Sequence, residues 1–177
     1  AQGFHGVTVT DANGCSLSDE FFIDGPDAIL INVISLSDPS CFDSSDGSVS
    51  IDAEGGSGNF SYVWSNGATG SNISNIPAGS YTVTVTDGNG CQKTSGYTLQ
   101  EPLPINISFP SVNNVTCNGL TNGSATAQGS GGNGNYTYDW SNGASGRTVQ
   151  NLAPGTYQVT VIDLQGCSEV SEVDITE

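Results

Sequence analysis

The sequence predicts an all-β protein made of tandem β-sandwich domains arranged end to end. Apolar and polar residues alternate with a period of two between turns rich in glycine and asparagine. The i, i+3, i+4 apolar pattern of an amphipathic helix is almost absent. The chain also repeats itself every 76 residues without insertion or deletion, as Cys15, Cys91 and Cys167 illustrate.

The repeat divides the chain into one partial and two full units. Trp64 and Trp140 occupy the same place in successive units. Residues 1–27 match the last third of a unit, so we expect them to form the C-terminal strands of a truncated repeat. Residues 28–103 and 104–177 are then the first and second full repeats. The chain has no Met at all, which favours a segment of a longer protein.

Each full repeat is expected to contain about seven short strands. In the strongest of them, at 81–86, the apolar residues face inward and the threonines between them face outward. Asn66-Gly67 is a hairpin signal, because glycine accepts the positive φ of a tight turn. In order, the strands expected in the first repeat lie at 29–33, 48–53, 60–64, just after Asn66-Gly67, around 73–76, at 81–86 and around 97–99.

An aromatic pair predicts the type of sandwich. A Trp on the third strand and a Tyr at the start of the penultimate strand are typical of an immunoglobulin-like sandwich. Pro26 and Pro102 stand in very short joins between units, and such joins favour a stiff rod. The expected core residues are Trp64, Tyr81, Val83 and Val85 in the first repeat and Trp140, Tyr157, Val159 and Val161 in the second.

The composition excludes several classes of partner. Eighteen acidic side chains against two basic ones give a formal net charge of −16, which repels nucleic acid and anionic membranes. No apolar stretch is long enough to insert into a membrane. Five regularly spaced cysteines with a single histidine and no Cys-x-x-Cys indicate disulfides in an oxidising compartment. We expect neither a metal nor a cofactor.

The cysteines allow two pairings, and the sequence leaves both open. Bonds within a repeat would join Cys41 to Cys91 and Cys117 to Cys167. In a seven-stranded sandwich, however, the start of the second strand and the end of the sixth lie at opposite poles, about 20 Å apart, beyond the ~7 Å that a disulfide spans between Cα atoms. A bond between repeats, Cys41 to Cys167, is the alternative. Cys15 and Cys91 would then pair upstream and Cys117 downstream. Loss of the short strand after Asn66-Gly67 would reverse this argument.

Two groups of aspartates could suggest calcium. Asp11, Asp87 and Asp163 each precede a cysteine by four residues, but each turn offers one carboxylate, whereas a calcium cage needs several. We interpret these residues as caps of Asx-type turns. A second group, Asp38, Asp43 and Asp46 around Cys41, has no acidic counterpart in the second repeat. We interpret it as a set of solvated loop acids.

Catalytic sets are missing from the sequence. His5 is equivalent to Tyr81 and Tyr157, so we expect it in the same core place. Without a second histidine, the serine-triad, thiol-imidazole and zinc arrangements all lack parts. The threonine row at 82–86 is expected on the wet face of a strand. The sequence therefore predicts that the protein is not an enzyme.

The order of motifs resembles the SprB-type repeat of secreted surface proteins from Bacteroidota, a PKD-like sandwich. The matching motifs are Cys41, Asp46-Gly47-Ser48, Trp64-Ser65-Asn66-Gly67, Gly79-x-Tyr81-Thr82-Val83 and Asn89-Gly90-Cys91, with counterparts from Cys117 onward. The second repeat departs at Asn122 and Gln165, where the pattern has Asp and Asn. The resemblance implies long adhesins, some exported by type IX secretion and displayed on gliding cells.

Together these features predict a structural and adhesive segment of a long secreted surface adhesin or extracellular filament. The alternative is a polysaccharide-binding sandwich module of a secreted protein. The expected partners are neighbouring repeats of the same chain, with lateral self-association or a surface polysaccharide as further candidates. Nucleic acid is not an expected partner.

Overall fold

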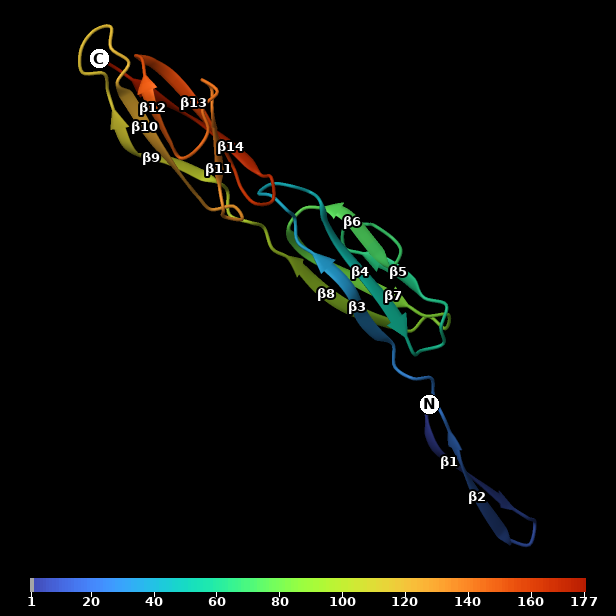
Figure 1. Cartoon of the computed structure of the whole chain (residues 1–177). Coiled ribbons are helices and arrows are strands. Elements are labelled where there is room, and N and C mark those ends of the chain that lie inside the picture. Colours follow the sequence, from blue (N-terminus) through green and yellow to red (C-terminus); the bar gives the residue numbers. More distant parts are fainter. Residues whose placement is uncertain (1) are drawn as a thin grey trace. The chain divides into compact units, whose positions relative to one another are not determined.

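A computed structural model describes residues 2–177, and all of its regular segments are β-strands (Figure 1). The bounds of the strands repeat with the 76-residue period of the sequence, so β3 corresponds to β9 and β8 to β14. Since this part of the chain contains no helix, it contains none that could cross a membrane. The strands are β1 (Gly3–Thr10), β2 (Ser16–Ile23), β3 (Leu30–Ser37), β4 (Gly47–Glu54), β5 (Ser61–Trp64), β6 (Asn72–Ile76), β7 (Gly79–Thr86), β8 (Gln92–Leu99), β9 (Asn106–Asn113), β10 (Gly123–Ser130), β11 (Thr137–Trp140), β12 (Thr148–Leu152), β13 (Gly155–Ile162) and β14 (Ser168–Ile175).

The second repeat is a sandwich of two three-stranded sheets, with strand orders β12-β10-β9 and β11-β13-β14. Neighbouring strands are antiparallel, and Trp140 on β11 lies opposite Val159 on β13. Every second residue of β13 is apolar, so one face of that strand closes the core while the other meets water. The buried core consists of Val115, Ala125, Ala127, Trp140, Val149, Leu152, Val159, Val161, Val173 and Ile175.

Small residues on β10 are matched by large ones around them. Ala127 and Gly129 stand where the first repeat has Ile51 and Ala53. Tyr136, which stands where the first repeat has Phe60, lies so close to Gly129 that a Cβ added there would be 3.0 Å from its ring. Phe109, on β9, packs against Trp140 with ring centroids 6.4 Å apart. Phe109 stands where the first repeat has Val33, so a larger side chain on β9 accompanies the smaller ones on β10, as close packing demands.

The first repeat has the same two strand orders, β3-β4-β6 and β5-β7-β8. Its expected core residues Trp64, Tyr81, Val83 and Val85 are buried. Trp64 is 2% exposed and its partner by period, Trp140, 4%. Tyr157 alone among the expected core residues is half-buried, and its hydroxyl donates to the carbonyl of Ala153 at 3.1 Å. The fold is thus a tandem of immunoglobulin-like sandwiches.

The number of strands differs from the expected seven. Each full repeat has six, and the short strand after Asn66-Gly67 is reduced to one isolated bridge between Val63 and Thr69. The reason lies at Gly70, whose φ of 98° turns the chain away from the neighbouring strand. Its carbonyl accepts the indole N–H of Trp64 at 2.9 Å. The second repeat has the same arrangement.

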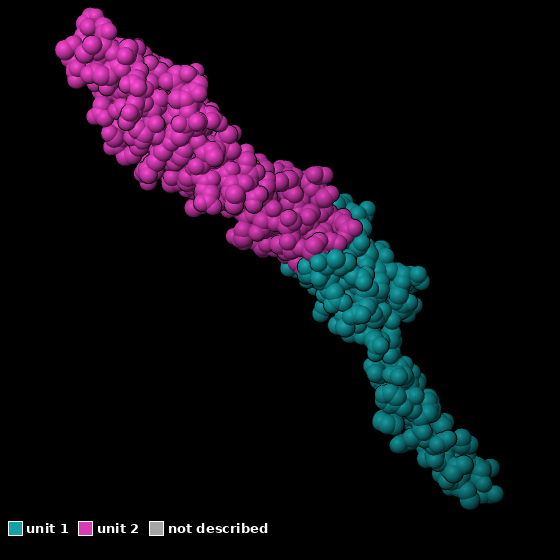
Figure 2. Space-filling view, viewed as in Figure 1, with its two compact units in different colours: residues 1–34, 51–71, 81–96 teal, residues 35–50, 72–80, 97–177 magenta. Residues whose placement is uncertain are grey.

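Contacts divide the chain into two compact units (Figure 2). One comprises residues 1–34, 51–71 and 81–96, and the other residues 35–50, 72–80 and 97–177. These units cut through the first repeat, so they do not test the repeat boundaries expected from the sequence, which stay a prediction.

The partial repeat at residues 1–27 is a two-stranded hairpin of β1 and β2, paired from Gly3↔Ile23 to Thr10↔Ser16. Here the expectation for His5 differs from the structure. Its ring is half-buried and stacks on Phe21, with centroids 6.0 Å apart, whereas Tyr81 lies in a sandwich core. Among the described residues β1 pairs only with β2, and no facing sheet covers the ring of His5.

Candidate functional site: the junction of Cys41 and Cys167

Cys167 lies in a turn that Asp163 organises from the end of β13. One carboxylate oxygen of Asp163 accepts the backbone N–H of Gln165 at 2.9 Å and that of Cys167 at 3.0 Å. The other oxygen accepts the backbone N–H of Asn133 at 2.8 Å. Asp87 holds Cys91 in the same way, and Asp11 holds Cys15. The recurring aspartate therefore presents the cysteine, and this agrees with its interpretation as the cap of an Asx-type turn.

These contacts favour the ionised form of the buried carboxylates. The N–H of Ser57 is the main cause that holds the pKa of Asp87 below its ordinary value, against the opposing effect of burial. Burial would raise the pKa of Asp163, but the hydrogen bonds from Asn133, Cys167 and Gln165 outweigh it and the pKa is lowered. Asp87 and Asp163 are 5% and 6% exposed.

Cys41 lies in the loop between β3 and β4, and Asp46 organises this loop. Its carboxylate accepts the backbone N–H of Ser40 at 2.9 Å and the hydroxyl of Ser44 at 2.6 Å. Hydrogen bonds from Ser40 and Ser44 hold the pKa of Asp46 far below its usual range. The Ser44 hydroxyl also lies 3.2 Å from the N–H of Cys41. Asp46 is thus a structural acceptor, not merely a solvated acid.

The equivalent loop around Cys117 uses amides for the same task. Asn122 Oδ1 accepts the N–H of Thr116 at 3.2 Å, as Asp46 does for Ser40. Asn114 Oδ1 accepts the N–H of Thr176 at 3.1 Å, the counterpart of the bond from Gln100 to Asp38. The departure of the second repeat from the aspartate pattern is therefore explained, because an amide oxygen accepts the same hydrogen bond without the charge.

A disulfide joins Cys41 to Cys167, with Cα atoms 5.6 Å apart and a sequence separation of 126 residues. It is the pairing between repeats. The carbonyl oxygen of Ser40 lies 3.3 Å from Sγ of Cys167 and accepts a hydrogen bond from Nδ2 of Asn133 at 3.0 Å. One backbone carbonyl of the Cys41 loop therefore accepts a hydrogen bond from Asn133 of the second repeat beside the covalent bond.

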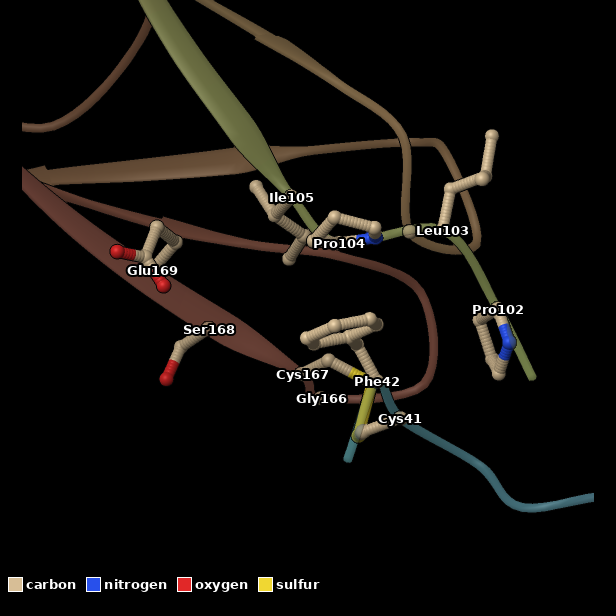
Figure 3. Close-up of a pocket in the computed structure, with 11 residues that line it drawn as sticks. Cys41, Phe42, Pro102, Leu103, Pro104, Ile105, Gly166, Cys167, Ser168 and Glu169 are labelled. Atoms are coloured by element: carbon tan, nitrogen blue, oxygen red, sulfur yellow. A yellow bond between two sulfur atoms is a disulfide. The ribbon is translucent and has the colours of Figure 1, made fainter. Parts of the chain in front are cut away.

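A cavity of about 310 Å³ adjoins this bond. Phe42, the residue after Cys41, points its ring toward Pro104 and Ile105 across the cavity (Figure 3). The join between the repeats supplies Pro102, Leu103 and Pro104, and the Cys167 turn supplies the opposite wall. The Cys41 loop thus reaches the second repeat with one covalent and one apolar group.

Three cysteines of the described chain are free and exposed: Cys15, Cys91 and Cys117. The structure therefore brings together two of the five candidate cysteines. Within-repeat bonds from Cys41 to Cys91 and from Cys117 to Cys167 do not occur among the described residues. The short strand expected after Asn66-Gly67 is nearly lost, yet the pairing that would follow from its loss is not adopted.

The acidic residues near Cys41 do not gather around a common point. Across residues 2–177, no group of three or more His, Cys, Asp or Glu side chains is arranged to hold a metal ion. Asp38 instead accepts the N–H of Gln100 at 2.8 Å, and Glu101 accepts the N–H of Asp43 at 2.6 Å. These carboxylates close the pole of the first sandwich.

The sequence did not point to three residues of the junction. Ser40 and Phe42 follow no repeated motif, since the second repeat has Thr116 and Asn118 at these positions. Asn133 replaces Ser57 of the first repeat. The change from Ser57 to Asn133 at a glycine-rich turn was the available signal in the sequence. It does not show which residue Asn133 contacts, so the hydrogen bond to Ser40 could be found only from the tertiary structure.

The strand order and the bonded cysteines define an immunoglobulin-like module with a covalent tie to its neighbour. The model of the SprB repeat family matches one segment in each full repeat, at residues 33–69 and 110–145. A match to this repeat family, together with a disulfide, indicates an extracellular or surface protein. More generally, it indicates a repeat module of a surface adhesin. No curated protein matches the chain.

The solved structures that resemble the chain have low sequence identity to it. A C-terminal fragment of intimin, crystallised with the intimin-binding domain of its receptor Tir, is 13% identical with a TM-score of 0.40, over 85% of this chain and 64% of that one. Sidekick-1 immunoglobulin domains 1–4 are 14% identical with a TM-score of 0.39, over 99% and 58%. The BSP domain of a biofilm-associated protein is 17% identical with a TM-score of 0.29, over 84% and 30%. The chain thus spans less than two thirds of each of these structures.

Proposed function

We propose that the chain is a load-bearing segment of a long secreted adhesin, in which disulfides tie each repeat to the next. The observation that carries this proposal is the bond from Cys41 to Cys167, which encloses most of both full repeats. A bond within a sandwich would stabilise that sandwich alone. A bond between sandwiches also limits how far they separate under tension, which is the property that a stalk requires.

The remaining features of the chain fit this role. A net charge of −16 keeps neighbouring chains apart and soluble. The joins are short and contain Pro26, Pro102 and Pro104, and proline restricts the backbone of a linker. Display on gliding cells and export by type IX secretion belong to the same proposal, because the resemblance to SprB-type repeats implies them for some members. We propose no catalytic role.

Small-angle X-ray scattering of the chain tests the proposal. The oxidised protein should give a narrow distribution of interatomic distances, and Cys167→Ser should broaden it. Rotary-shadowed electron images should show a thin rod. Compact globules, or identical scattering from the two proteins, would refute a stiff disulfide-tied stalk.

Polysaccharide binding is the second candidate, and one groove of the second repeat favours it. The groove has a volume of about 490 Å³ and is lined by Tyr136, Tyr138, Asp139 and Arg147 among others. Aromatic rings beside charged and hydroxyl groups are suited to sugar rings and hydroxyls. Trp64 and Trp140 take no part, since both are buried. A glycan array probed with the chain and with Arg147→Ala would detect such binding, and no bound glycan would exclude this candidate.

A further inference from the structure

A second cavity, of about 280 Å³, lies at Cys91 in the first repeat. Eight of its nine lining positions are equivalents, 76 residues earlier, of positions that line the cavity at Cys167. Pro26, Ile29, Gly56 and Cys91 are even identical in type to their counterparts. The main difference is that the Cys41 loop, through Cys41 and Phe42, lines the cavity at Cys167, whereas no such loop lines the cavity at Cys91.

The two cavities are formed by turns of the same geometry. Asp87 holds the N–H of Cys91 at 2.9 Å, and Asp163 holds that of Cys167 at 3.0 Å. Gly56 donates its N–H to the carbonyl of Asp27 at 2.8 Å, as Gly132 does to Leu103. The thiol of Cys91 is free and exposed. The first repeat therefore presents the same cavity and cysteine that hold the Cys41 loop in the second repeat.

Charge indicates which loop fits at Cys91. Lys93, one of two basic side chains in the chain, lines this cavity, whereas the equivalent position at Cys167 is Glu169. Asp27 also lines the cavity at Cys91, where the cavity at Cys167 has Leu103. The Cys41 loop carries Asp38, Asp43 and Asp46. A lysine beside the cavity attracts such an acidic loop and neutralises part of its charge.

We propose that the cavity at Cys91 is a docking site for an acidic Cys-Phe loop of the Cys41 type from another copy of the repeat, sealed by a disulfide to Cys91. The aromatic ring after the incoming cysteine lines the cavity together with Ile29, as Phe42 does with Ile105. This inference rests on the proposed function, because it makes the Cys41–Cys167 junction one of a series of head-to-tail connections between copies of the repeat.

The covalent step needs an oxidant, and a protein disulfide of the thiol–disulfide oxidoreductase class is suitable. The Cys91 thiol and the incoming thiol together lose two electrons and two protons and form one S–S bond. The disulfide of the oxidant takes up both and becomes a dithiol.

A synthetic peptide tests the docking site directly. The probe has the sequence of residues 38–46, with its cysteine activated as a 2-pyridyl disulfide. The Cys91 thiolate attacks the peptide sulfur, a new S–S bond forms, and pyridine-2-thiolate leaves and takes up a proton, so that its absorbance reports the rate. Two proteins with a single free thiol are compared: Cys15→Ser/Cys117→Ser leaves Cys91, and Cys91→Ser/Cys117→Ser leaves Cys15.

Cys15 is the matched control. Asp11 holds its N–H at 2.8 Å, as Asp87 holds that of Cys91, but positions equivalent to Ile29 and Gly56 fall before residue 1. The rate with the peptide, divided by the rate with the small neutral reagent 4,4′-dithiodipyridine, should be at least about tenfold higher at Cys91 than at Cys15, which corresponds to ~1.4 kcal/mol.

Two further changes identify the cause of the preference. A peptide with alanine in place of the residue equivalent to Phe42 should lose most of the advantage. In the protein, Lys93→Glu should reduce it severalfold, and salt should do the same. Equal rate ratios at Cys91 and Cys15, or a preference that survives both changes, would overturn the docking site. Neither outcome would touch the load-bearing role of the Cys41–Cys167 bond, which force measurements test separately.

Discussion

Because of the bond from Cys41 to Cys167, most of the chain should not extend when its two ends are pulled apart. It joins residues 126 positions apart, so 125 residues lie inside the covalent loop. Strands β4 to β13 belong to that loop, whereas β3 and β14 lie outside it. A pull on the two ends of the oxidised chain therefore passes from β3 through the disulfide to β14.

The magnitude follows from the length of an extended chain. A stretch of 126 residues at about 3.5 Å per residue spans about 440 Å, whereas the Cα atoms of the bonded cysteines are 5.6 Å apart. The fully stretched oxidised chain should therefore be about 430 to 440 Å shorter than the Cys41→Ser/Cys167→Ser variant. Single-molecule force spectroscopy with handles at both ends measures this difference.

The assay also distinguishes the alternative pairings. A single bond from Cys41 to Cys91, or from Cys117 to Cys167, would shorten the stretched chain by only about 175 Å, and both together by about 350 Å. Addition of a reductant to the unsubstituted chain should restore the full length and serves as the control. A shortening near 175 or 350 Å, or none, would refute the junction between repeats and the load path derived from it.

The other predictions concern stability. Trp140→Ala should lower the free energy of unfolding by about 3–5 kcal/mol, because it leaves a large cavity in the core; a loss below about 1 kcal/mol in urea unfolding would contradict the observed burial. Gly123→Ala should also destabilise the second sandwich, since the new Cβ would lie 2.7 Å from Ile175 and 2.9 Å from the carbonyl of Leu152; an unchanged melting temperature would argue against that contact. Asp87 and Asp163 have lowered pKa values in the folded chain, so their stabilisation is complete above the ordinary value of 3.8 and is lost as the pH falls below it through the folded values. Asp163→Asn should therefore reduce the loss of melting temperature as the pH falls below that value. An unaltered dependence of the melting temperature on pH would speak against the lowered pKa of Asp163. Reaction of the activated peptide with Cys91 should be faster than with Cys15, as set out above.

Much of the fold was predictable because it depends on local pattern. The alternation of Tyr81, Val83 and Val85 with threonines sets which face of β7 is buried, whatever the neighbouring strands are. The 76-residue period carries over to every strand boundary, since equal spacing of turn residues imposes equal strand lengths. The role of Asp87 and Asp163 as turn caps was also accessible, because the capped N–H groups lie within four residues.

Local pattern was less informative where two interactions compete for the same group. Asn66-Gly67 predicted a turn followed by a paired strand, and the turn is present. The strand shrinks to a single bridge at Thr69 because the Gly70 carbonyl serves the indole of Trp64. Trp64 and Gly70 are only six residues apart, but which group the Gly70 carbonyl pairs with depends on the burial of Trp64 in the core, which the local pattern does not show.

By itself, the sequence determined the repeat, the sandwich class, the buried tryptophans and the presence of reactive cysteines in equivalent turns. It left the partner of Cys41 open, because Cys91 and Cys167 occupy equivalent turns, each four residues after a capping aspartate. Only the tertiary structure decided the pairing. A disulfide requires Cα atoms within about 7 Å, and the fold brings Cys167, not Cys91, to within 5.6 Å of Cys41. The choice depends on proximity across 126 residues, which periodicity cannot encode.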